Sequence, residues 1–90
     1  MEIEKLISAL EETISYLRRS QPLHPSHMSI EEIIRRLEAE VGKAKNSKPV
    51  NINLLDRLFA PTGVIQEISI DNGWGRMFLR ISEVVDEFTR

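Results

Sequence analysis

Apolar residues in the first half of the chain recur at steps of three and four positions, the spacing of one stripe along an α-helix. The first stripe consists of Ile3, Leu6, Ile7, Leu10, Ile14 and Leu17. The second stripe consists of Ile30, Ile33, Ile34, Leu37 and Val41. These stripes predict helices over residues 3–19 and 30–44, and we expect the two helices to pack as an antiparallel hairpin.

The residues between the two stripes favour a loop followed by a helix start. Pro22 and Pro25 lack the backbone N–H that a helix interior needs. Ser29 stands three residues before Glu32, the capping-box arrangement in which each side chain satisfies a free amide at a helix start. The second helix is therefore expected to begin directly after Ser29.

A polar stretch containing Pro49 separates this hairpin from the rest of the chain, and we interpret residues 46–51 as a linker. Asn51 or Asn53 can cap a short third helix. Its expected inward face consists of Ile52, Leu55, Leu58 and Phe59. Pro61 ends this helix, because a residue that precedes a proline is pushed out of the α region.

Residues 62–70 fit two local structures. As a helix, the segment is capped by Thr62 and closed by Gly73, a residue type that readily adopts the left-handed conformation. As a strand, its apolar residues alternate, and Asn72-Gly73 is a strong hairpin-turn signal. A hairpin needs a returning strand, however, and residues 76–88 follow the helical period through Phe78, Ile81, Val85 and Phe88. We therefore predict a helix on each side of Gly73.

The predicted fold class is all-α, a small single-domain bundle of four to five short helices over residues 1–90. It comprises the helical hairpin (1–45), the linker (46–51) and C-terminal helices (52–90). The alternative is an α+β fold with a hairpin at Asn72-Gly73. With 41% hydrophobic and 29% charged residues, the composition is that of a globular protein.

The cysteine content and the lengths of the apolar runs bear on the cellular location of the protein. The formal net charge is −2, and no cysteine is present to form a disulfide or a thiolate metal site. The chain opens Met-Glu-Ile-Glu-Lys and contains no long apolar run, so neither a signal peptide nor a membrane span is expected. We expect a cytoplasmic protein.

The side chains that could support catalysis or bind a metal are few. His24 and His27 lie in a loop, and two imidazoles do not complete a zinc site, which ordinarily uses three or four ligands. The glycines match neither the dinucleotide nor the phosphate-loop spacing. No catalytic residue, metal or cofactor is predicted, and the expected protein is not an enzyme.

Residues 62–84 resemble the helix-turn-helix DNA-binding motif in the spacing of a few residue types. The matching positions are Ile65, Ile68, Ser69, Gly73, Trp74 and Leu79. The pattern departs from the motif at Ser82, where the second helix should turn an apolar residue inward. The resemblance implies a recognition helix reading DNA through Arg76, Met77 and Arg80. Against it, Glu83, Asp86 and Glu87 would face the phosphates.

The function expected from the sequence is therefore binding to another protein, as an inhibitor, immunity-type protein, adaptor or regulatory protein. The candidate partner-binding residues are Trp74, Arg76, Met77 and Arg80, because Trp and Arg are enriched at the centres of interfaces. Trp74 is expected to be mainly a packing residue between the last two helices. A homodimer is a further expected arrangement, since a thin core gains from burying another apolar face. A DNA-binding regulator is the alternative.

Overall fold

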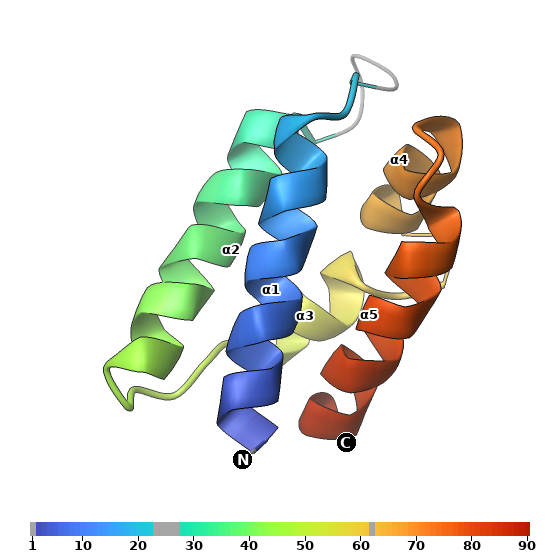
Figure 1. Ribbon diagram of the computed structural model, residues 1–90. Coiled ribbons are helices and arrows are strands. Elements are labelled where there is room, and N and C mark those ends of the chain that lie inside the picture. The colour runs from blue at the N-terminus through green and yellow to red at the C-terminus, as the bar shows by residue number, and fades with distance from the viewer. Residues whose placement is uncertain (1, 23–27, 62) are drawn as a thin grey trace.

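The computed structural model describes residues 2–22, 28–61 and 63–90, and every regular element within those residues is an α-helix (Figure 1). The helices are α1 (Glu2–Arg18), α2 (Ile30–Lys45), α3 (Ile52–Leu58), α4 (Val64–Asp71) and α5 (Gly75–Thr89). The all-α prediction is confirmed. The alternative hairpin at Asn72-Gly73 is wrong, because helices flank that position on both sides.

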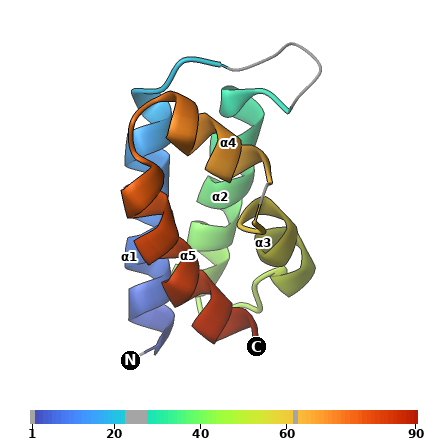
Figure 2. The ribbon, with the colours of Figure 1, turned by 90° about the vertical axis from the view of Figure 1, so that its right-hand side faces the viewer.

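Helices α1 and α2 form the predicted antiparallel hairpin, with α1 lying between α2 and α5 (Figures 1 and 2). Arg18 bonds Glu38 at 2.6 Å and Lys45 bonds Glu11 at 3.0 Å, so two ion pairs join the helices at different levels. Exposed pairs of this kind contribute little free energy. The stability of the hairpin therefore comes from its buried stripes, in which Leu6, Leu10, Ile33 and Leu37 are fully inaccessible.

The start of α2 has half of the capping box that the sequence predicts. The Ser29 hydroxyl accepts a hydrogen bond from the Glu32 N–H at 3.1 Å. The Glu32 carboxylate does not turn back to the cap. It accepts hydrogen bonds from Arg36 at 2.9 Å and Arg35 at 3.0 Å. The hydrogen bond from Arg36, together with the charge of Arg35, lowers the pKa of Glu32.

A buried carboxylate fixes the passage from α2 to α3. Glu40 is 3% exposed, and it accepts hydrogen bonds from the Asn51 N–H at 2.7 Å and from Lys43 Nζ at 3.0 Å. Asn51 is the cap of α3, its side chain accepting from the Leu54 N–H at 3.0 Å. One prediction for α3 is wrong: Ile52 is 45% exposed, and Leu54 is buried instead. The inward face of this short helix therefore begins at Leu54.

Helix α4 begins one residue later than expected. Its N-cap is Gly63, and the predicted cap Thr62 lies outside the described residues. Ile65, Ile68 and Ser69 are buried, which is the i, i+3, i+4 face of a helix.

Helix α5 completes the core by packing against α1, α3 and α4. Phe78, Ile81 and Val85 are buried along it, while Phe88 is partly buried against the core. Phe78 stacks on Phe59, with ring centroids 6.1 Å apart and planes 4° from parallel. Buried residues of all five helices belong to one hydrophobic cluster.

Candidate functional site

The turn between α4 and α5 is closed by hydrogen bonds that a left-handed residue makes possible. Gly73 has φ +82°, and its N–H donates to the Ile70 carbonyl at 3.3 Å. The Trp74 N–H donates to the Ser69 carbonyl at 2.8 Å. These are the two bonds of a Schellman motif, so the chain leaves α4 in a fixed direction.

Trp74 follows directly and is buried, with 6% of its surface exposed. Its indole stacks on Tyr16 of α1, with ring centroids 4.9 Å apart and planes 10° from parallel. The indole N–H donates to the Ser20 hydroxyl at 2.9 Å. Trp74 therefore fastens the corner onto the end of α1 and presents little surface to a partner.

Asn72 makes a second connection to the same end of α1. Its side-chain oxygen accepts from the Gln21 N–H at 2.9 Å, and its amide donates to the Gln21 carbonyl at 3.2 Å. The amide also donates to the Ile68 carbonyl at 2.9 Å. Sequence reasoning missed these contacts, because nothing in the local pattern shows that residues 20 and 21 return to residues 72–74.

The other three candidate residues lie exposed on the first turns of α5. Arg80 Nη2 bonds Glu12 of α1 at 2.7 Å and lies 3.4 Å from Met77 Sδ. Met77 is 37% exposed. Arg76 is exposed and makes no ion pair with any part of the chain that the structure describes. Arg76, Met77 and Arg80 thus lie near one another on the exposed start of α5, and the buried Trp74 anchors that start to α1.

Two exposed apolar side chains join this region, and the sequence reasoning did not single them out as a site. Ile70, at the end of α4, is 64% exposed, and Leu79 is 55% exposed. A Cβ placed on Gly75 would lie 3.4 Å from Ile70 Cγ1, so Ile70 lies against Gly75. Leu79 is four residues beyond Gly75, hence on the same side of α5. We call Ile70, Arg76, Met77, Leu79 and Arg80 the corner surface.

The register of α5 differs from the one that the helix-turn-helix pattern requires. In that pattern the side chain of Leu79 points inward, and the next side chain that points inward is that of residue 82. In the structure Phe78 and Ile81 are 2% exposed, whereas Leu79 is 55% exposed. The helix therefore turns its apolar face inward one residue earlier than the motif does.

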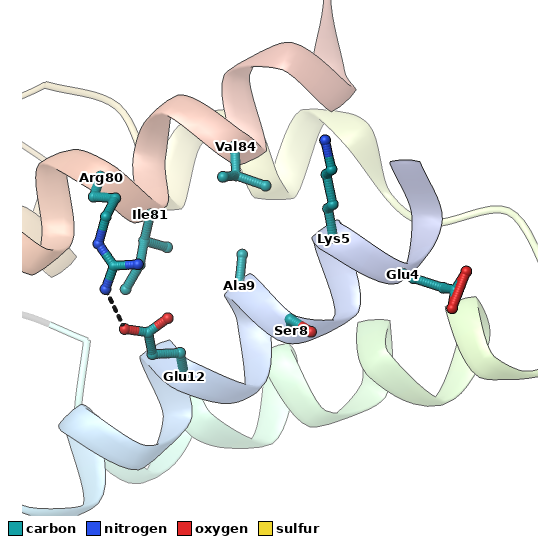
Figure 3. A pocket seen from close by; sticks show the side chains of 8 residues that line it. All are labelled: Glu4, Lys5, Ser8, Ala9, Glu12, Arg80, Ile81 and Val84. Carbon is teal, nitrogen blue, oxygen red and sulfur yellow. Dashed lines mark hydrogen bonds and ion pairs between the residues drawn. The ribbon is translucent and has the colours of Figure 1, made fainter. Parts of the chain in front are cut away.

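A groove of about 360 Å³ runs between α1 and α5 beside this surface (Figure 3). Ala9, Ile81 and Val84 line its apolar part, Arg80 and Glu12 point toward each other near one end, and Lys5 reaches toward α5 near the other. Its other lining residues are Glu4 and Ser8. None of these eight described side chains is a histidine or a cysteine.

Within the described ranges 2–22, 28–61 and 63–90, no group of three or more His, Cys, Asp or Glu residues could hold a metal ion. His24 and His27 lie outside those ranges. None of the described helices is long and apolar enough to cross a membrane.

Comparison of the chain with protein-family models, curated proteins and solved structures finds no match.

Proposed function

We propose that this chain is a cytoplasmic, non-enzymatic protein-interaction module, of the inhibitor, immunity, adaptor or regulatory kind, and that it binds its partner through the corner surface. This proposal is based mainly on two exposed apolar side chains, Ile70 (64% exposed) and Leu79 (55% exposed), on one side of the α4–α5 corner. Exposed apolar side chains that adjoin one another are a mark of interaction sites, whereas single ones are ordinary.

The support beneath the corner surface strengthens this proposal. Binding is weakened by the entropy lost when mobile side chains and loops become ordered at an interface. Here the backbone direction is fixed at Gly73, and Trp74 and Asn72 hold the corner to α1 through bonds of 2.9 Å to Ser20 and Gln21. A partner would therefore meet a surface whose backbone is already ordered.

The chemistry of the corner surface indicates the kind of partner. Its apolar part, Ile70 and Leu79, is bordered by Arg76, and Arg is among the residues enriched in interface cores. A partner with an apolar patch beside acidic groups complements this arrangement. DNA is less well matched, because Glu83, Asp86 and Glu87 continue along the same helix and repel phosphates.

The test is a pull-down from a lysate of the source organism with three tagged proteins, each with and without nuclease. The first is the wild type, and the second carries Ile70→Glu with Leu79→Glu. The third is a matched control carrying Met28→Glu with Ile52→Glu, two apolar residues exposed elsewhere, at 37% and 45%.

We expect a nuclease-resistant protein to be recovered by the wild type and the control, and to be lost with the corner variant. Recovery of the same protein by the corner variant would show that another surface binds it. A signal consisting only of nucleic acid and abolished by nuclease would favour the DNA-binding alternative.

A further inference from the structure

The outward face of α5 carries a stripe of charges ordered by sign. Arg76, Arg80, Glu83 and Glu87 follow one another at steps of four, three and four residues, and all four are exposed. This spacing places them on one line along the helix. Figure 2 looks onto α5 from outside the bundle, and no other described element covers it in that view.

Two of the three neighbouring pairs in this stripe are unfavourable on an isolated helix, and the third, Arg80 with Glu83, joins opposite charges. Arg76 and Arg80 are like charges four residues apart, as are Glu83 and Glu87, and such pairs repel on a helix surface. The stripe also opposes the helix dipole, which favours acids near the N-terminus and bases near the C-terminus. Helices α1 and α2 follow that rule at both ends, whereas α5 has no acid in its first turn and no base in its last.

A second copy of the same helix, running antiparallel, complements the stripe. With the two-fold axis midway between Ile81 and Ser82, Arg76 lies opposite Glu87 of the second copy, and Arg80 lies opposite Glu83. A single axis satisfies both pairings. The two-fold symmetry also produces the same two pairs with the copies exchanged, so that four ion pairs form in all. The same operation sets the two helix dipoles antiparallel.

We propose that the partner bound at this face is a second copy of the chain, paired through α5 in this antiparallel register. The proposal rests on the proposed function in assigning a protein partner to the exposed side of α5. A two-fold axis perpendicular to the plane of the two helices puts both Leu79 side chains on the same flank of the pair. They lie about 7.5 Å apart along the helix axes, given a rise of about 1.5 Å per residue.

The contact between α1 and α5 is compatible with this pairing. Arg80 bonds Glu12 at 2.7 Å, yet its side chain remains 61% exposed. Arg has several N–H donors, so one guanidinium can serve two carboxylates. Among the described residues, Arg76 and Glu83 have no ion-pair partner within the chain.

The experiment is sedimentation equilibrium of purified, tag-free protein from about 1 µM to 1 mM, the range in which weak dimers form. It uses the wild type, an acidic variant (Arg76→Glu with Arg80→Glu) and a basic variant (Glu83→Arg with Glu87→Arg). A charge-matched control carries Lys48→Glu with Arg57→Glu, two exposed bases outside α5. Far-UV circular dichroism verifies that each variant is folded.

We expect the wild type and the control to approach twice the chain mass of 10.4 kDa. Each stripe variant alone should have its dimer Kd raised at least about tenfold, because like charges then face each other. An equimolar mixture of the acidic and basic variants should restore the dimer. High salt should weaken that mixed dimer, since the screening length falls from about 10 Å at 0.1 M to 3 Å at 1 M.

A wild type that stays monomeric over the whole range would overturn the proposal, as would a dimer that both stripe variants keep. After either result, recovery of a different protein by the wild type and its loss with the Ile70→Glu, Leu79→Glu variant would still support the proposed function. Failure of self-association is therefore distinguishable from failure of the proposed function.

Discussion

Trp74 is a single residue that joins segments far apart in the sequence. Replacement by Ala removes a side chain that is 6% exposed and its stack on Tyr16, so we expect the free energy of unfolding to fall by about 3 to 5 kcal/mol. Ser20→Ala removes the acceptor of the indole N–H and also the bond that the Ser20 hydroxyl donates to the Tyr16 carbonyl, and should cost about 1 to 3 kcal/mol. Urea titration followed by far-UV circular dichroism measures both. A Trp74→Ala variant as stable as the wild type would show that the indole contributes no packing.

Glu40 is the one acidic residue among the described positions that is buried. Glu40→Ala leaves the Asn51 N–H without its acceptor and Lys43 without its partner, so the free energy of unfolding should drop by roughly 1 to 3 kcal/mol. Glu40→Gln retains an acceptor oxygen and should lose less. Equal losses in the two variants, measured by urea titration, would show that the charge of Glu40 matters and the hydrogen bond to Asn51 does not.

Hydrophobic periodicity is enough to predict the two long helices. The expected ranges 3–19 and 30–44 match α1 (Glu2–Arg18) and α2 (Ile30–Lys45) closely, because each has a continuous buried stripe. The short helices are harder to predict in detail. In α3 the inward face was misjudged at Ile52, since seven residues provide too few turns to average out one apolar residue that faces solvent.

The candidate site at the corner between α4 and α5 could also be predicted only in part from the sequence. The sequence indicated Gly73 as the turn and Trp74 as a packing residue, both through local chemistry. It could not indicate Tyr16, Ser20 and Gln21 as their supports, because those contacts span more than fifty positions. The exposure of Leu79 likewise depends on how α5 is rotated against α1, which only tertiary packing decides.

Gly73 and Gly75 provide a matched pair of tests for the turn. Gly73→Ala forces an alanine into φ +82°, which should destabilise the fold by about 1 to 2 kcal/mol. Gly75→Ala adds a Cβ at an ordinary contact distance of 3.4 Å from Ile70 Cγ1 at the start of a helix, and should cause no loss. Thermal unfolding of both variants measures the difference. A destabilised Gly75→Ala together with an unaffected Gly73→Ala would contradict the assigned turn.

The start of α2 provides a test of pH dependence. The pKa of Glu32 is lowered in the folded protein by the hydrogen bond from Arg36 and the charge of Arg35. A lowered folded-state pKa adds stability above the unfolded pKa, and this contribution disappears as the pH falls through the folded value. The advantage of the wild type over Glu32→Gln should therefore shrink as the pH falls below about 4. Urea midpoints at pH 7 and pH 3 measure it, and an advantage that grows at acid pH would contradict the sign.

Helix α1 connects α2, its partner in the hairpin, with the C-terminal helices. It packs against α2 on one side and α5 on the other (Figures 1 and 2), and α5 in turn packs on α3 and α4. The buried residues of all five helices form one cluster. Neither half therefore has a core of its own, and we expect the molecule to unfold as one cooperative unit.

This cooperativity can be measured, because Trp74 reports on the corner and circular dichroism reports on all helices. Leu37→Ala removes a fully buried side chain from α2 and should cost about 2 to 5 kcal/mol. Although Leu37 belongs to the hairpin, the urea midpoint of Trp74 fluorescence should fall by the same amount as that of circular dichroism. If Leu37→Ala lowered the dichroism midpoint and left the Trp74 midpoint in place, the corner would be a separate folding unit. Coincident midpoints would instead mean that the corner surface is held in place by the whole core, hairpin included.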